Sequence, residues 1–132
     1  MRHLRVLLCC ALFITPALAE VLEGDAERGR LAFHSCRTCH YPEQGIGHNN
    51  GPALWNILGQ TAGTQPGFDG YSETMKQSGV VWNEAYLDAW LANPDAFMPG
   101  TTMIALPIED AQHRADIIAY LKTFAPKPVE SR

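Results

Sequence analysis

Two cysteines and a histidine stand close together in the segment Cys36-Arg37-Thr38-Cys39-His40. Thiols three residues apart on one helical turn can add to the two vinyl groups of a single porphyrin. The histidine directly after the second cysteine then lies under the iron, where its imidazole can serve as an axial ligand. The segment therefore predicts one covalently bound c-type haem, held by Cys36, Cys39 and His40, with His40 also binding the iron.

Three other kinds of site can contain a Cys-x-x-Cys pair. A thioredoxin-like redox pair lies in a strand–helix pattern, and no such pattern surrounds Cys36. Half of a zinc site would need a second cysteine pair, which is absent, and the remaining histidines are scattered. A structural disulfide is the third alternative. Together with the export signal described next, the motif favours haem attachment.

The first 19 residues are typical of a secretory signal peptide. Basic residues precede an almost wholly apolar run from 4 to 14, which is too short to span a bilayer. Ala17-Leu18-Ala19 supplies the small-x-small cleavage pattern, so we expect the mature chain to begin at Glu20. In a bacterium the predicted location is the periplasm, the oxidising compartment in which haem can be attached. A retained membrane anchor is the weaker alternative.

Removal of residues 1–19 leaves one predicted domain, residues 20–132, and two cysteines, both in the haem motif. The basic residues fall from 10 to 8 while the 14 acidic residues remain, so the net charge becomes about −6. No basic patch or basic helix is left. We therefore expect neither nucleic acid binding nor stable membrane insertion.

The elements that position the motif are predicted to be short helices joined by Gly- and Pro-rich loops. The first helix opens at Asp25, carries apolar or small residues at spacings of three and four, and runs into the motif. The other predicted helices are 72–78, one that follows Asn83 and stops at Asn93-Pro94, and one that follows Asp110 and ends near Lys122. Residues 41–70 and 94–107 are predicted loops, the first long enough to suggest that it wraps a cofactor.

A six-coordinate iron needs a second axial ligand on the opposite face of the haem. Met103 follows the turn-forming residues 99–102, so its thioether can project from an extended loop, and Thr101 can donate a hydrogen bond near it. Met98 is the competitor, because a methionine is usually a flexible core filler and position alone does not separate the two. The remaining candidates are Met75, interpreted as packing, His34, too near the motif, and His48 and His113, interpreted as surface residues.

Several segments between residues 24 and 124 keep an order and spacing typical of one haem-protein family. They are residues 24–33, 36–40, 51–54, 66–68, 93–103 and 114–122, together with Tyr71 and Trp82. With these motifs the chain resembles the class I cytochromes c of the mitochondrial and bacterial c2-like type. The resemblance implies an all-α fold of short helices and long loops around one covalent haem, with crossing N- and C-terminal helices.

The resemblance also implies residue roles. Met103 would be the sixth iron ligand, while the carbonyl of Pro52 would accept a hydrogen bond from the His40 ring. Tyr71 and Trp82 would hydrogen-bond a haem propionate. At the crossing of the terminal helices, one pair of residues would pack against another: Gly29 and Phe33 against Ile117 and Tyr120.

Two departures from the family concern the haem, and one concerns docking. Gln60 stands where the family usually has an arginine near a propionate, and Trp90 replaces a tyrosine that usually faces the methionine ligand. Mitochondrial members surround the exposed haem edge with lysines. The matching positions here are Ser35, Asn49, Asp95, Thr102, Glu109 and Asp110. We therefore expect donor and acceptor proteins that are neutral or basic, or docking through apolar surface.

Together these features predict a soluble, monomeric carrier of single electrons rather than an enzyme. Two alternatives belong to other classes: an electron-relay subunit of an oxidoreductase complex, and a catalytic or gas-binding haem protein with an open sixth site. Met103 argues against the second, because a filled axial position leaves little room for a substrate on the iron.

Overall fold

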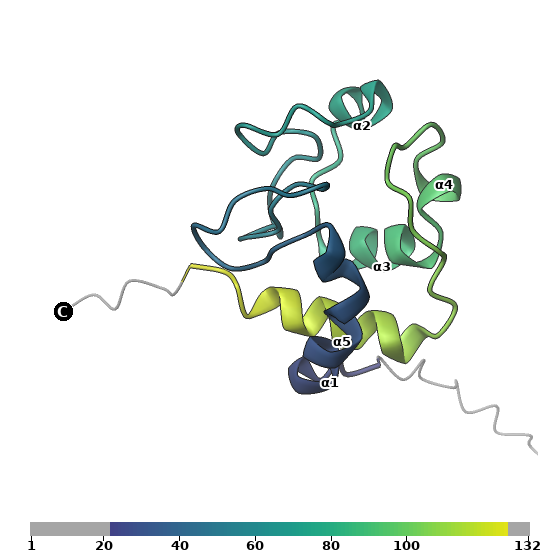
Figure 1. The fold of residues 1–132 in the computed structure, drawn as a ribbon. Coiled ribbons are helices and arrows are strands. Elements are labelled where there is room, and N and C mark those ends of the chain that lie inside the picture. The colour runs from purple at the N-terminus through teal and green to yellow at the C-terminus, as the bar shows by residue number, and fades with distance from the viewer. Residues whose placement is uncertain (1–21, 127–132) are drawn as a thin grey trace, which may run out of the picture.

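The computed structural model describes residues 22–126, which form short helices separated by long loops (Figure 1). In chain order the helices are α1 (Ala26–Ala32), the 3-10 helix η1 (Phe33–Thr38), α2 (Glu73–Gln77), α3 (Glu84–Ala92), α4 (Pro94–Phe97) and α5 (Ala111–Lys122). Within the described residues the β pairing is limited to one isolated bridge between Thr61 and Val81. The predicted all-α class is therefore confirmed. The predicted signal peptide, residues 1–19, lies outside the described residues.

Side-chain caps fix the starts of the predicted helices. The Asp25 carboxylate accepts a hydrogen bond from the Arg28 N–H at 2.7 Å, and the Asn83 side chain accepts one from the Tyr86 N–H at 2.8 Å. Ser72 caps α2 and Asp110 caps α5 in the same way. Each cap satisfies a backbone donor that the first helical turn leaves without an internal partner.

The helix α4 corrects one prediction, because the sequence pattern predicts a loop throughout residues 94–107. Asn93 ends α3 and at the same time caps α4, its side chain accepting a hydrogen bond from the Ala96 N–H at 3.0 Å. Pro94 occupies the first helical position, where its fixed φ suits a helix and its missing N–H costs nothing. The same Asn-Pro pair that stops one helix therefore starts the next.

The terminal helices α1 and α5 cross in close contact, as the resemblance implies (Figure 1). A Cβ atom at Gly29 would overlap the carbonyl of Asp116, so only glycine allows this approach. One turn later, the ring of Phe33 lies 5.5 Å from that of Tyr120, and Ile117 is 1% exposed. The crossing therefore presents η1, and with it the haem motif, to the interior.

A buried carboxylate, that of Asp116, connects the helices α1 and α5 through hydrogen bonds. Asp116 on α5 accepts hydrogen bonds from the backbone N–H of Asp25 at 2.8 Å and from the Arg28 guanidinium at 2.7 and 2.8 Å. The Gln112 amide adds a fourth at 2.9 Å. The Arg28 hydrogen bonds above all hold the pKa of Asp116 well below its usual range. Arg28 and Asp116 lie 88 positions apart in the chain, and their pairing was not predicted.

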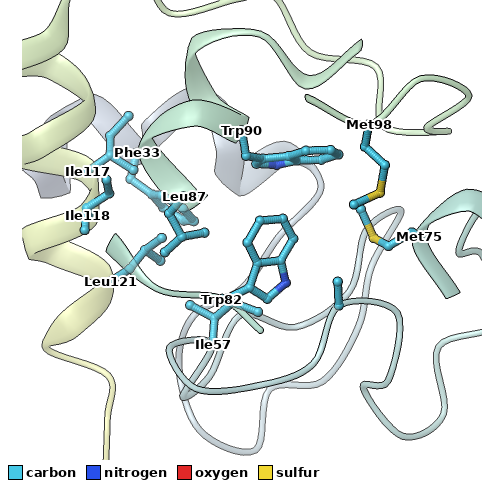
Figure 2. Packing of buried hydrophobic residues seen from close by; sticks show 11 residues of the cluster. Phe33, Ile57, Met75, Trp82, Leu87, Trp90, Met98, Ile117, Ile118 and Leu121 are labelled. Carbon is cyan, nitrogen blue, oxygen red and sulfur yellow. The ribbon is translucent and has the colours of Figure 1, made fainter. Parts of the chain in front are cut away.

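The second part of the core surrounds two tryptophans (Figure 2). The rings of Trp82 and Trp90 meet edge to face, with centroids 5.6 Å apart. Met75 and Met98 belong to the same buried cluster, and Figure 2 shows both side chains reaching into it. Both methionines therefore pack in the protein interior, as predicted for Met75 and as the resemblance implies for Met98. None of the helices in residues 22–126 combines the length and apolar character that a bilayer crossing demands.

Candidate functional site

The cysteine–histidine motif forms one tight turn. Cys36 lies in η1 and Cys39 caps its C-terminal end. The backbone N–H groups of Cys39 and His40 both bond to the carbonyl of Cys36, at 3.0 and 2.9 Å. Both thiols are free and half-buried, so the disulfide alternative does not describe this structure. Burial raises the pKa of the Cys36 thiol.

The imidazole of His40 is held in one orientation. Its Nδ1 lies 2.7 Å from the carbonyl oxygen of Pro52, the hydrogen bond that the resemblance implies. Burial lowers the pKa of His40, although the Pro52 carbonyl opposes this effect, so the ring is neutral and Nδ1–H is the donor. The other ring nitrogen, Nε2, is then left with its lone pair free. A neutral imidazole oriented in this way is suited to bind a metal ion.

The backbone beside His40 closes this side of the site. A Cβ atom at Gly51 would overlap the His40 ring, so the glycine lets the main chain lie flat against the imidazole. The Gly51 N–H bonds to the Cys39 carbonyl, and the Leu54 N–H bonds to the Tyr41 carbonyl, both at 2.9 Å. These bonds tie residues 51–54 to the haem motif.

Met103 lies in the loop that follows α4 and is half-buried against the core. Its backbone N–H donates to the Thr101 hydroxyl oxygen at 3.2 Å, so Thr101 here acts as an acceptor, and its own O–H remains available. The Thr102 hydroxyl donates to the Gly70 carbonyl at 3.2 Å. The loop that carries Met103 is thus anchored to Gly70, and a Cβ atom at Gly100 would stand 3.0 Å from the Thr74 hydroxyl.

Tyr71 and Trp82 both keep a polar donor for another group. The Trp82 side chain is largely buried, but its indole N–H is not fully enclosed and forms no hydrogen bond within residues 22–126. Burial raises the pKa of Tyr71, so its hydroxyl stays protonated and can donate. The indole N–H of a buried tryptophan usually has a hydrogen-bond partner, and a propionate carboxylate would supply one.

A further set of side chains packs against the buried core while remaining partly exposed, and several of them would form the lining of the haem site. The set is Ala32, Cys36, Leu54, Leu58, Tyr71, Val80, Leu91, Phe97, Met103, Ile108 and Tyr120. A flat apolar cofactor would cover such side chains. With the glycine cradle at His40 and the free donors at Tyr71 and Trp82, this lining fits a haem.

The remaining predicted ligand candidates lie elsewhere. His113 is exposed, as expected, and His34 is exposed as well. His48 corrects the expectation of a surface residue, because it is half-buried and uses both ring nitrogens: Nδ1 accepts from the Ala53 N–H and Nε2 donates to the Pro66 carbonyl, each at 2.9 Å. It therefore ties the long loop together. No periodicity marks this role in the sequence, since its partners lie 5 and 18 positions away.

Comparison with known proteins identifies the family. No family model matches the chain. Cytochrome c2 of Rhodomicrobium vannielii is 43% identical over 100 residues, which is 76% of this chain and 79% of that protein. The chain belongs to the class I cytochrome c family. Cytochrome c of Chlamydomonas reinhardtii is 42% identical over 105 residues, or 79% of this chain and 93% of its own.

A solved structure supports the same assignment. Cytochrome cH from Methylobacterium extorquens aligns with a TM-score of 0.71 and 40% identity, covering 76% of this chain and 99% of its own. The all-α cytochrome c fold is thereby confirmed. As a class I cytochrome c, the chain carries one covalently attached c-type haem and is a small electron carrier that acts with redox partner proteins.

Proposed function

We propose that this cytochrome c is a periplasmic carrier of single electrons whose haem iron is bound by His40 and Met103. One observation carries the proposal: of the six possible sixth ligands, five are accounted for elsewhere. Two methionines are buried in the core, two histidines are exposed, and His48 uses both ring nitrogens. Met103 alone combines a flexible thioether, partial burial and an anchored loop.

When bound, the haem supplies a couple between ferrous and ferric iron. Residues of this chain would set the relative stability of the two oxidation states. The Pro52 carbonyl increases the basicity of His40, which supports the ferric state, whereas a methionine thioether favours the ferrous state. Because both axial positions would be filled, no substrate would reach the iron. This supports a carrier rather than an enzyme.

Tyr71 and Trp82 would position a propionate. The backbone holds Trp82 in position for this role, since the backbone N–H of Trp82 donates to the Gln60 carbonyl at 2.9 Å. Gln60 contributes no cation beside that propionate, and Trp90 presents no hydroxyl toward the methionine ligand. We expect the missing cation to lower the midpoint potential relative to a variant that carries Arg at position 60.

The location and the partners complete the proposal. The signal-like residues 1–19 and the bacterial relatives both support export to the periplasm. Acidic residues occupy positions where mitochondrial relatives have lysine, so partners with acidic docking sites would be repelled. The chain would act as a monomer. Mass measurement of the exported protein, with Glu20 expected as its first residue, tests the cleavage site.

The ligand assignment is tested by the red-region absorption spectrum of the ferric protein. Met103→Leu removes the sulfur with little change in volume and should abolish the weak sulfur-to-iron charge-transfer band. Met98→Leu is the matched control and should retain the band. Loss of the band in Met98→Leu but not in Met103→Leu would identify Met98 as the ligand. A parent protein with high-spin iron and ready carbon monoxide binding would instead indicate an open sixth site.

A further inference from the structure

The loop directly after Met103 presents two large apolar side chains to solvent. Ile104 is 101% exposed and Leu106 is 88% exposed, whereas no other large apolar side chain in residues 22–126 exceeds 60%. The loop is anchored at both ends, by the Thr102 hydroxyl, which donates to the Gly70 carbonyl at 3.2 Å, and by the Ile108 N–H, which donates to the Leu91 carbonyl at 3.0 Å. Two fully exposed large apolar side chains, two positions apart on an anchored loop, are a feature typical of binding surfaces.

The charges of the described chain are distributed unevenly around this loop. Every lysine and arginine in residues 22–126 forms an ion pair: Arg28 with Asp116, Arg30 with Glu27, Arg37 with Glu43, Lys76 with Glu73, Arg114 with Asp88 and Lys122 with Glu84. Five acidic residues in the same part of the chain take part in no ion pair: Glu23, Asp69, Asp95, Glu109 and Asp110.

Four of these five free carboxylates flank the apolar loop. Glu109 and Asp110 follow it in the chain. Asp95 lies on α4, which leads into the loop, and the Met98 carbonyl at the end of α4 accepts from the Thr101 N–H at 3.1 Å (Figure 1). Asp69 precedes Gly70, whose carbonyl binds the Thr102 hydroxyl. All four are exposed. The apolar loop therefore has an acidic rim, and no cation of residues 22–126 compensates this rim through an ion pair.

We propose that Ile104 and Leu106, with this acidic rim, form the docking surface for a redox protein whose own contact face is apolar and ringed by lysine or arginine. The inference rests on the proposed function, because Met103 ligation would place the loop at the haem edge. Opposite charges steer the encounter, and apolar burial holds the complex. Like charges disfavour a second copy of this chain, an anionic membrane and an acidic partner.

Voltammetry of the haem-loaded protein tests the chemistry of this surface directly. One gold electrode carries a mixed methyl- and ammonium-terminated monolayer, and the other carries a carboxylate-terminated monolayer. We expect reversible, fast electron exchange at the first electrode and exchange about tenfold slower at the second, with the contrast shrinking as salt is raised. Leu106→Gln should weaken adsorption to the first surface about tenfold.

Matched variants separate the docking surface from general surface effects. Leu31→Gln makes the same replacement at an exposed position on α1 and should leave adsorption unchanged. Asp95→Asn with Glu109→Gln should reduce the preference for the ammonium surface, whereas Glu23→Gln, at the remaining free carboxylate, should not. Equal behaviour at both electrodes, or equal effects of Leu106→Gln and Leu31→Gln, would overturn the inference.

The electrode response also distinguishes failure of the docking surface from failure of the carrier function. Absence of a reversible wave at either electrode would overturn the carrier proposal, and this inference with it, whereas a reversible wave without surface preference overturns the docking surface alone. Co-sedimentation with phosphatidylcholine vesicles is expected to be negligible. If the protein bound these vesicles and Leu106→Gln abolished the binding, the loop would bind a neutral lipid surface rather than a partner protein, and the inference would be overturned.

Discussion

The imidazole of His40 is fixed by backbone rather than by other side chains. The Pro52 carbonyl receives its Nδ1–H at 2.7 Å, and the main chain at Gly51 lies flat against the ring. Backbone groups have few alternative positions, so they orient a ligand more rigidly than a long side chain could. The orientation of the proposed proximal ligand therefore depends on a residue that has no side chain.

This dependence gives a prediction at Gly51. The Cβ atom of Gly51→Ala would overlap the His40 ring, and the ring cannot move without losing its bond to Pro52. We expect a loss of about 2 kcal/mol in the free energy of unfolding, together with an altered circular dichroism of the haem absorption band. Urea unfolding of the loaded protein and its visible-region spectrum measure the two effects.

Gly79→Ala is the control for this substitution. Gly79 has a φ of +63° and open space where a Cβ would stand, so alanine there costs only backbone strain, about 1 kcal/mol. It should leave the haem band unchanged. A haem band equally unchanged in Gly51→Ala would show that the glycine does not position the ring.

Single residues were predictable from the sequence where their chemistry is local. Cys36, Cys39 and His40 lie within one turn, so their proposed haem-binding role follows from neighbouring positions alone. His48 and Asp116 were missed for the opposite reason. Their function arises from hydrogen bonds to segments distant in the chain, which no local pattern records.

At the scale of elements, the crossing of α1 and α5 combines close packing with a buried charge network. Gly29 permits the approach, and Asp116 then receives donors from both helices and from the chain that enters α1. A buried carboxylate is tolerated because its oxygens are satisfied by hydrogen bonds. Gly29 and Asp116 are therefore two of the residues on which the geometry of the crossing depends.

This network predicts a pH dependence of stability. Because the pKa of Asp116 is lower in the folded than in the unfolded chain, its contribution is fully present above about pH 4 and is lost as the pH falls below that value. Asp116→Asn should be less stable than the parent at pH 7 and should lose less stability on acidification. Urea unfolding between pH 7 and pH 2 measures both curves.

Asp69→Asn provides the control, since Asp69 is exposed and forms no ion pair in the described part of the chain. Its replacement should change the free energy of unfolding at neutral pH by less than about 0.5 kcal/mol. Parallel acid curves for Asp116→Asn and the parent would contradict the assigned role of Asp116.

Most element boundaries followed from caps and breakers in the sequence, and α4 shows where such reasoning stops. Asn93-Pro94 is both a stop signal for α3 and a start signal for a new helix, and the stop signal alone predicts a loop. A helix of four residues has no periodicity of its own. Its existence depends on the cap and on packing of Phe97 against Trp82 and Trp90, which is tertiary information.

At the scale of the molecule, the helices account for only part of the chain, and residues 41–70 contain none. The sequence predicted this long loop and its wrapping around a cofactor. The half-exposed apolar lining agrees, because protein alone leaves those side chains unburied. The fold could be predicted because the haem motif predicted the cofactor. A bound haem explains why residues 41–70 form a long loop, which composition and periodicity do not explain.

The same reasoning predicts that the chain does not fold without its haem. Cys36→Ser with Cys39→Ser removes both attachment points, so the largest apolar component of the interior can dissociate and the lining residues face water. We expect the helical circular dichroism to fall by roughly half or more, and the cooperative thermal transition to disappear. Cys36→Ser alone, which retains one attachment point, should lie between this variant and the parent.

A reducing agent separates this effect from a disulfide. Cys36 and Cys39 form no disulfide in the structure, so dithiothreitol should not change the transition of the loaded parent protein when the iron is kept ferrous in both samples. Native helical signal and a cooperative transition in the haem-free double variant would mean that the protein core is sufficient alone. Contacts among residues 41–70 would then have to hold the long loop in place without the cofactor.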